Sequence, residues 1–421
     1  MLICNTINYP IIRNPTYDFA GQSYATLYPN LHKYPATMLP QIGIEILKEL
    51  NISKGRMLDP YCGSGSSFVA AIHSGLRYLR GYDINPLAAL IAEAKFTNVE
   101  IDELESAKNK LKHHVSAFIK DKSNIESIEL PTYHNLNYWF SMDTARYLCV
   151  LRKFVNEIEP KSIRRFFWVA LSETIRECSY TRSSEFKLFR IKPQYIIGFN
   201  PEVVSLFFSK LSRNIDIFQY CYKPLLNGIN VCIEAKEFNS ISDYFDVVLT
   251  SPPYGDSRTT VAYGQFSLFA NEWMEIESPR KLDANMFGGK ASKILYTNGL
   301  IYDYIKRIDL ESSKRAKEIS SYYFDMEKSI SKVAKSVRSG GFVVYIVGNR
   351  IVKGIQLPTD QFIAEKFEEN GFEHIFTYER FIGNKHMPLQ NSPSNQIGKR
   401  ANTMSREYII VCKNINRVPI T

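Results

Sequence analysis

Residues 250–254, in the order Thr-Ser-Pro-Pro-Tyr, have the residue types best suited to chemistry, and they follow the apolar run 245–249. A proline pair cannot continue the hydrogen bonds of a sheet, so the backbone must leave the sheet here and expose carbonyl groups. The Ser251 hydroxyl and the Pro252 carbonyl can accept hydrogen bonds from an amino group, and Tyr254 can stack on a nucleobase. These residues therefore suit methyl transfer to an exocyclic amine of a nucleobase. Taken alone, such a loop is more often a strand-ending turn with a surface tyrosine.

A glycine-rich loop at residues 59–67 (Asp-Pro-Tyr-Cys-Gly-Ser-Gly-Ser-Ser) supplies the context that this chemistry requires. It follows a short apolar strand and precedes a predicted helix at 68–72, with Ser66 or Ser67 as its N-cap. Its two glycines allow a tight turn and a close approach of the backbone to a ligand. The Lys-Ser/Thr pair of a phosphate-binding loop is missing. By itself, a Gly-x-Gly turn is more often ordinary strand-to-helix punctuation.

The next predicted strand ends at Asp83, about 20 residues beyond the glycine loop, where doubly wound nucleotide-binding sheets keep an acid for ribose hydroxyls. We therefore assign Asp83 as a ribose ligand. The alternative is a turn or helix-capping aspartate before Asn85 and Pro86, and one carboxylate can serve both purposes. In an open α/β sheet, ligands gather at the carboxyl ends of the strands, so these segments are expected to meet.

Together these segments resemble the amino-methylating DNA methyltransferases, which act on N4 of cytosine or N6 of adenine. Residues 250–254 resemble their Ser/Asp/Asn-Pro-Pro-Tyr signature, and the serine form looks like the N4-cytosine members. Residues 59–66 resemble their Asp-Pro-Phe-x-Gly-Ser-Gly-Thr loop, with Tyr61 and Ser66 as mild departures. The resemblance covers residues 24–98 and 226–266 well and extends more loosely to 322–413.

The resemblance implies S-adenosylmethionine as the cofactor. Tyr-Pro-Ala at residues 34–36 is similar to the segment that packs against the methionine part of this cofactor. Glu234 stands where family members usually carry an aspartate that accepts the adenine amino group, although an exposed strand-end glutamate is nearly as good an interpretation. The residues assigned to the cofactor are Tyr34, Pro35, Asp59, Tyr61, Gly63, Gly65, Asp83 and Glu234, and those assigned to catalysis are Ser251, Pro252, Pro253 and Tyr254.

The expected fold is a class I S-adenosylmethionine-dependent methyltransferase (Rossmann-like) α/β sheet with a mainly helical inserted domain. Residues 24–98, 226–266 and 322–416 are predicted to form the core, 99–225 the insertion, and 267–321 loops that recognise DNA. In the last core segment, a helix is expected to open at Tyr323 and to stop at Ser339-Gly340-Gly341, before a buried strand at 342–347. A second helix spans 359–370, and strands at 375–381 and 407–412 form an antiparallel pair by resemblance.

The insertion is the first candidate for contact with double-stranded DNA. Residues 151–179 show helical spacing, and the wider segment 151–223 carries thirteen Lys/Arg residues against seven Asp/Glu, a net charge of +6 out of +9 for the whole chain. Such an excess suits a surface that grips phosphates, although scattered basic residues mostly form solvated helix faces. The second candidate region follows the catalytic loop, from 257 through 315. The residues proposed for DNA contact are Arg182, Lys187, Arg190 and Arg258.

Composition is consistent with these predictions. The 421 residues, 45 % of them hydrophobic, are enough for two or three domains, and a pI near 9.0 points to a polyanionic partner. The seven dispersed cysteines form no Cys-x-x-Cys pair, which argues against a disulfide framework or a zinc site. The sequence shows neither a signal peptide nor an apolar run approaching a membrane span, so we expect a cytoplasmic protein.

The sequence thus predicts a sequence-specific DNA methyltransferase acting on N4 of cytosine, with N6 of adenine as the alternative. Methylation at carbon 5 of cytosine needs a cysteine nucleophile, which that family presents after a proline, and no Pro-Cys pair occurs here. The target base must leave the duplex to be methylated, which implies base flipping. Further alternatives are an RNA base methyltransferase and a non-catalytic DNA-binding specificity protein. A partner restriction endonuclease is implied by the resemblance only.

Overall fold

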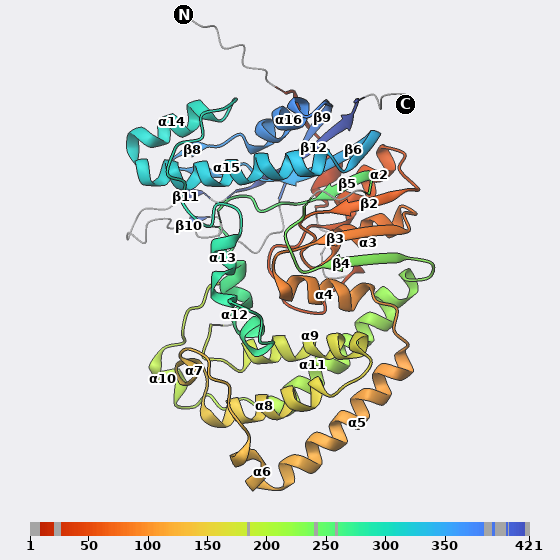
Figure 1. Cartoon of the computed structure of the whole chain (residues 1–421), viewed down its shortest axis with the longest axis vertical. Coiled ribbons are helices and arrows are strands. Elements are labelled where there is room, and N and C mark those ends of the chain that lie inside the picture. The colour runs from red at the N-terminus through yellow and green to blue at the C-terminus, as the bar shows by residue number, and fades with distance from the viewer. Residues whose placement is uncertain are drawn as a thin grey trace, which may run out of the picture.

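The structure of the 421-residue chain is a computed structural model. It describes residues 9–20, 27–182, 186–239, 243–256, 260–382, 390–391, 401–402 and 404–416. Figure 1 shows a sheet with its covering helices in the upper half and a group of helices in the lower half. The predicted Rossmann-like α/β fold is confirmed by this mostly parallel sheet between helices.

An eight-stranded sheet with the order β1-β9-β12-β6-β5-β2-β3-β4 lies at the centre of the fold. Strand β12 runs antiparallel to both of its neighbours, whereas the other adjoining pairs are parallel. The antiparallel pair expected near the C-terminus is therefore present. The strands of this sheet are β1 (Ile11–Arg13), β2 (Arg56–Asp59), β3 (Tyr78–Tyr82), β4 (Asn230–Glu234), β5 (Phe245–Thr250), β6 (Val337–Val347), β9 (Phe372–Phe381) and β12 (Arg406–Asn414). Two short hairpins pair β7 (Ile351–Val352) with β8 (Ile355–Gln356), and β10 (Gln390–Asn391) with β11 (Ala401–Asn402).

Alternate residues of the central strands face two different helical layers. Met57 of β2 and Leu249 of β5 belong to one buried cluster, whereas Leu58 and Val248 belong to another. This division follows from the two-residue period of a strand, which sends successive side chains to opposite faces. Because both faces are covered, the inner residues of β2 and β5 are apolar on both sides, as is typical of parallel sheets.

Helices α2, α3 and α4 contribute to the first cluster, and α14, α15 and α16 to the second. The helices are α2 (Pro40–Glu49), α3 (Ser66–His73), α4 (Pro86–Phe96), α5 (Ile101–Lys120), α6 (Lys122–Ser127), α7 (Leu136–Trp139), α8 (Met142–Asn156), α9 (Lys161–Glu177), α10 (Pro193–Ile196), α11 (Val203–Ile217), α12 (Tyr263–Trp273), α13 (Leu282–Asn285), α14 (Tyr302–Glu311), α15 (Ser313–Ala334) and α16 (Thr359–Glu369). Among the described residues, no helix combines the length and the apolar character that crossing a membrane would require.

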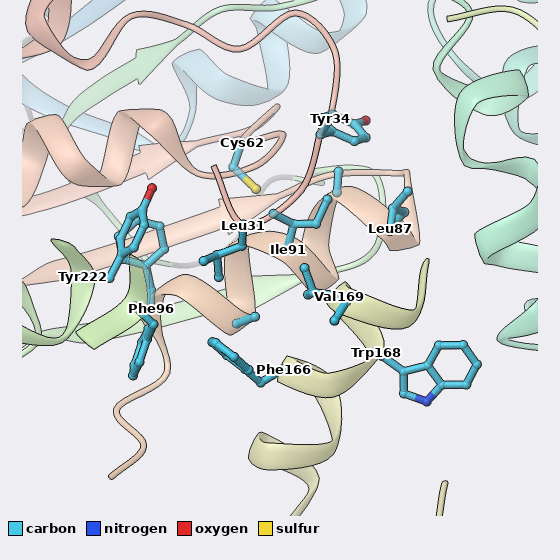
Figure 2. Packing of buried hydrophobic residues seen from close by; sticks show 14 of the residues in the cluster. Leu31, Tyr34, Cys62, Leu87, Ile91, Phe96, Phe166, Trp168, Val169 and Tyr222 are labelled. Atoms are coloured by element: carbon cyan, nitrogen blue, oxygen red, sulfur yellow. The ribbon is translucent and has the colours of Figure 1, made fainter. Parts of the chain in front are cut away.

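Helices α5 to α11 lie between β3 and β4 in the sequence and occupy the lower half of Figure 1. The helical spacing predicted over 151–179 belongs to two helices, α8 and α9, with Pro160 between them. Figure 2 shows Phe166 and Val169 of α9 beside Ile91 of α4, and all three belong to one buried cluster. The inserted helices therefore share a hydrophobic core with a helix that covers the sheet.

Two sequence predictions near the end of the chain were wrong in detail. Helix α15 begins at Ser313, ten residues before the expected start, because the Ser312 side chain accepts the Arg315 N–H and caps it. The Ser-Gly-Gly segment at 339–341 does not stop this helix, which ends at Ala334. It lies instead in an irregular part of β6, where the pairing with β5 shifts, and Gly340 has a φ of +73°.

The order of the strands creates a switch point beside β2. The chain passes from β2 to β3 and β4 on one side, and returns to β5 on the other side of β2. The loops that follow β2 and β5 therefore leave the carboxyl ends of neighbouring strands in different directions. Open α/β sheets bind ligands at such a point. The glycine-rich loop follows β2, and the Ser-Pro-Pro-Tyr loop follows β5.

Candidate active site

A cavity of about 560 Å³ lies where the loops after β2, β3 and β5 meet. Its volume falls in the range of small-molecule sites, roughly 300–1,000 Å³. Four loops that the sequence singled out therefore face one space. The predicted site residues that line it are Tyr34, Asp59, Tyr61, Gly63, Asp83, Ser251 and Pro253.

Asp59, at the end of β2, joins the two loops at the switch point. Its carboxylate accepts the Thr250 hydroxyl at 2.6 Å and the Tyr61 N–H at 3.0 Å, and also the Ser67 hydroxyl. These donors come from the end of β5, the glycine-rich loop and the start of α3. Burial raises the pKa of Asp59 to about 6. The carboxylate thus holds the cavity wall together through protein contacts.

Asp83 lies in the cavity wall and stabilises the loops around it. Its two oxygens accept the Gly63 N–H at 2.9 Å and the Asn85 N–H at 2.8 Å. Asn85 in turn caps α4 by accepting the Leu87 N–H. Burial raises the pKa of Asp83 to about 6. The structure shows Asp83 in the turn-forming role. Because Asp83 also lines the cavity, its role as a ribose ligand stays a prediction.

The two glycines of the loop serve different purposes. Gly65 is the N-cap of α3, with a φ of +85°, and a Cβ atom there would lie 2.6 Å from the ring of Phe96. The expected side-chain cap by Ser66 or Ser67 is absent from this helix. Gly63 lines the cavity with a φ of +50°, and a Cβ atom at this position would meet no described residue other than its chain neighbours within 4 Å. Gly63 therefore leaves room for a ligand, whereas Gly65 allows the loop to pack on α4.

Tyr34 contributes an aromatic wall to the cavity. Its hydroxyl accepts a hydrogen bond from the Asn85 side chain at 2.9 Å, and its ring stacks on Tyr263 with centroids 5.9 Å apart. Tyr263 opens α12 and also lines the cavity. Pro35, which the sequence grouped with Tyr34, is outside the cavity lining. The segment at 34–36 is thus connected to Asp83 through Asn85.

Glu234 ends β4 but does not line the cavity. Its carboxylate pairs with Lys236 at 2.5 Å and with Arg80 at 3.6 Å, and the hydrogen bond from Lys236 lowers its pKa. Glu237 and Phe238, a few residues further along, face the cavity instead. The structure therefore offers Glu237 as the acidic group of this wall.

The Ser-Pro-Pro-Tyr loop presents Ser251 and Pro253 to the cavity, while Pro252 is buried. The Ser251 and Tyr254 hydroxyl oxygens lie 3.1 Å apart. The carbonyl of Pro253 accepts the Tyr322 hydroxyl at 2.8 Å, which fixes the loop against α15. Tyr254 is partly buried and is not among the residues that line the cavity. Ser251 is therefore the hydroxyl that this loop presents to the cavity.

Comparison with known proteins identifies the family. No family model matches the sequence. The chain is 33 % identical over 431 residues to the Type II methyltransferase M.MvaI of Kocuria varians, a match that covers 95 % of this chain and 94 % of that protein. The chain belongs to the Type II methyltransferases. It is thus a sequence-specific DNA methyltransferase of the amino-methylating family, and membership implies S-adenosylmethionine as the methyl donor.

More distant similarities are weaker. The chain is 22 % identical over 235 residues to the Type II methyltransferase M.MjaII of Methanocaldococcus jannaschii, covering 54 % of this chain and 42 % of that protein. Among solved structures, the rRNA methyltransferase aviRa from Streptomyces viridochromogenes aligns over 95 % of this chain and 93 % of its own, with 10 % identity and a TM-score of 0.30. A TM-score this low carries no argument about function.

The Type II methyltransferase also has a cavity wall that the sequence did not predict. Residues 284–287 around the end of α13, together with Lys290, line the cavity, as do Ser321, Asp325 and Lys328 of α15. They come from a region predicted partly as DNA-recognition loops and partly as ordinary core. The polar residues of α15 recur at four- and three-residue spacing, which places them on one helix face. That spacing is the signal by which they could have been found.

The residues predicted to bind DNA lie in different environments. Arg182 is exposed, with its guanidinium 5.8 Å from the ring centre of Phe189. Arg190 is half-buried and stacks at 4.1 Å over Tyr138. Lys187 is near Asp283, the carboxylate that accepts N–H groups at the start of α12. Arg258 lies outside the described residues.

The raised pKa of Asp59, about 6, yields a prediction about stability. The folded protein binds this proton more tightly than the unfolded chain, where an aspartate has a pKa of about 4. The protonated Asp59 side chain therefore contributes its full stabilisation to the folded state below about pH 4, and this stabilisation is lost as the pH rises through about 6. Asp59→Asn removes this titration, so its stability relative to the parent should rise by up to roughly 3 kcal/mol across that interval. Urea denaturation at several pH values measures the difference, and a difference that does not change with pH would contradict the assignment.

Proposed function

We propose that this Type II methyltransferase transfers a methyl group to the exocyclic N4 amine of cytosine in double-stranded DNA. The observation that carries the proposal is the position of Ser251, which lies in the loop after β5 and lines the same cavity as the glycine-rich loop. The serine form of the loop resembles the N4-cytosine members. Methylation of the N6 amine of adenine is the alternative, since the same acceptors would suit that amine.

The cavity fits S-adenosylmethionine on several observations. Its volume of about 560 Å³ suits a nucleoside that carries an amino acid. The Ser64 hydroxyl is buried in its wall and finds no hydrogen-bond partner among the described residues, so a ligand would satisfy it. Gly63 leaves room for a ligand beside it. When bound, the cofactor supplies an electrophilic methyl group on a sulfonium.

We assign the ends of the cofactor from the residues around the cavity. Gly63 and Ser64 would hold its amino-acid end, together with Tyr34, as the resemblance implies. Asp83 would accept the ribose hydroxyls. Glu237 and Phe238 would face the adenine, because they occupy the wall that Glu234 does not reach.

In the proposed reaction, the Ser251 hydroxyl accepts a hydrogen bond from the target amine and draws its lone pair out of ring conjugation. The lone pair would then attack the methyl carbon in line as the bond from that carbon to the cofactor's sulfur breaks, which leaves a neutral thioether, and the methylated amine would release one proton. Tyr254 provides a stacking surface for the flipped base. No cysteine nucleophile is required, because the amine itself attacks.

The assignment of Asp83 predicts how the cofactor binds. Asp83→Ala should weaken S-adenosylmethionine binding by about 1.5–3 kcal/mol, because charge-assisted hydrogen bonds are removed. Because burial raises the pKa of Asp83 to about 6, ribose hydroxyls that favour the ionised form should bind more tightly as the pH rises through that value. Titration calorimetry between about pH 5 and pH 7.5 tests both effects. Asp143→Ala, at a residue with an 81 % exposed side chain, is the control. Unchanged affinity in folded Asp83→Ala protein would remove Asp83 from the site.

The proposed chemistry predicts both the product and the rate. Mass spectrometry of nucleosides from DNA of cells that express the chain should detect N4-methylcytosine, and N6-methyladenine alone would overturn the choice of base. In single turnovers, Ser251→Ala should slow methyl transfer more than it weakens DNA binding, because the hydrogen bond to the amine matters mainly in the transition state. Ser127→Ala, at an exposed position of α6, should keep the parental rate. Parental rates for Ser251→Ala and Tyr254→Ala together would refute the catalytic loop.

We also propose that the segment around α10 contacts DNA. Exposed aromatic side chains, among them Phe189 at 45 % and Tyr195 at 63 % exposure, alternate here with Arg182 and Lys192. Basic groups that bind phosphates, interleaved with rings that can stack, are typical of nucleic-acid surfaces. The Leu188 N–H donates to the Gln265 side chain of α12 at 3.3 Å, so the segment is attached to the helix that Tyr263 opens at the cavity.

Neutralising this surface should weaken DNA binding for all sequences alike. Replacing Arg182, Lys187 and Arg190 with glutamine should flatten the salt dependence of binding by about 0.9 in log–log slope for each phosphate that the protein no longer neutralises. Arg190 should contribute least, because its guanidinium stacks on Tyr138. Lys112→Gln, at an exposed position of α5, is the control. Fluorescence anisotropy at several salt concentrations gives the slope, and an unchanged slope would mean that these residues form a solvated face.

We further propose that the modification protects DNA from a restriction endonuclease with the same recognition sequence. Support comes from the resemblance and from the Type II designation of the relatives. The methyltransferase would act on the DNA on its own, and the shared DNA sequence would be its link to the nuclease.

A further inference from the structure

A chain of hydrogen bonds runs from the loop after β5 to side chains on β12 and β9. The Ser251 hydroxyl lies 3.1 Å from the Tyr254 hydroxyl, which donates at 3.1 Å to a carboxylate oxygen of Glu407. The other oxygen of Glu407 accepts a hydrogen bond from the Arg380 guanidinium at 3.0 Å. The acid lies 153 residues beyond Tyr254 in the sequence. Four side chains from three parts of the chain are thus connected in series.

The ion pair at the end of this chain is built into the sheet. Glu407 on β12 and Arg380 on β9 face each other directly in the antiparallel ladder. They are 4 % and 2 % exposed. Arg380 also donates to the carbonyl of Tyr17 at 2.8 Å. In its pair with the Arg380 guanidinium, Glu407 is a carboxylate that can only accept hydrogen bonds.

This ion pair determines the direction of the two hydrogen bonds that link Ser251, Tyr254 and Glu407. The Tyr254 hydroxyl has one hydrogen, which it donates to the Glu407 carboxylate. Burial raises the pKa of Tyr254, so the phenol keeps that hydrogen. The Tyr254 hydroxyl therefore cannot also donate a hydrogen bond to Ser251 and can only accept one from it. The Ser251 hydrogen therefore points toward Tyr254, which leaves the serine lone pairs for another donor.

We propose that Glu407, supported by Arg380, is a positioning residue that makes Ser251 a hydrogen-bond acceptor for the target amine. The inference rests on the proposed role of Ser251. An amine with two hydrogens needs an acceptor, and a serine that turned its own hydrogen toward the amine would oppose it. Glu407 does not touch the base, and it acts through Tyr254. Strand β12 thereby helps to determine the direction in which the Ser251 hydroxyl donates its hydrogen.

Glu407→Gln tests the polarity directly, because glutamine keeps the shape of the side chain but can donate as well as accept. The rate of methyl transfer at saturating DNA and cofactor should fall by about tenfold or more, with the KM for DNA nearly unchanged. Tyr254→Phe keeps the ring and removes the connecting hydroxyl, so its rate should fall similarly. Glu407→Asp, which keeps the charge on a shorter arm, should retain more activity than Glu407→Gln.

A double-mutant cycle separates this role from a general structural one. If Glu407 acts through Ser251, Glu407→Gln should cause little further loss once Ser251→Ala is present. Glu379→Gln, at a neighbouring strand acid that pairs with Arg406, is the matched control and should keep the parental rate. Thermal melting and cofactor affinity of each variant report on folding. Should Glu407→Gln fail to fold, Tyr254→Phe in the same cycle decides the question.

The outcomes distinguish the two proposals. A parental rate for Glu407→Gln beside a slow Ser251→Ala would overturn the positioning role and leave the proposed function standing. Additive losses would also overturn it, because Glu407 would then act independently of Ser251. Parental rates for Ser251→Ala and Glu407→Gln alike would refute the role of Ser251 itself.

Discussion

The arrangement of the site depends on the hydrogen bonds that the Asp59 carboxylate accepts. Three donors meet it, from the glycine-rich loop, from Ser67 at the start of α3 and from Thr250 at the end of β5. Burying a carboxylate is costly unless such donors compensate for the water that it gives up. Here the compensation comes from the two loops that must face each other.

The Ser-Pro-Pro-Tyr loop is held at each of its ends and in its middle. Thr250 bonds to Asp59 before the loop begins, the carbonyl of Pro253 accepts a hydrogen bond from Tyr322, and Tyr254 bonds to Glu407 where the loop ends. These contacts restrict the orientation of the loop, so part of the entropic cost of ordering it is met on folding. Ser251 lies between these anchors with its side chain at the cavity. A hydroxyl fixed in this way suits a reaction that depends on the direction of one lone pair.

The sequence predicted the features that local chemistry determines. The strands that carry the loops and the acid after β3 follow from apolar runs, glycines and prolines, and the structure has them. It did not predict Glu237, because a short turn carries the chain past the end of β4 before it faces the cavity. Nor did it predict the cavity wall of α15, which long-range packing brings to the site. The partner of Tyr254 was equally hidden, because Glu407 reads as an ordinary polar residue of a strand until β12 and β5 are placed in one sheet.

Asn85 explains how the inserted helices are positioned relative to the chemistry. It caps α4, donates to the Tyr34 hydroxyl, and donates to Ser267 of α12 at 2.6 Å. Helix α9 of the insertion packs on α4, and the proposed DNA segment is attached to α12 through Gln265. Both elements therefore contact α4, the helix that follows Asp83: α9 packs on it, and α12 is hydrogen-bonded to its N-cap. The inserted helices share their hydrophobic core with α4, so a surface far from the sheet is held in a fixed relation to the cavity. Recognition of DNA and placement of its target base can then depend on one rigid framework.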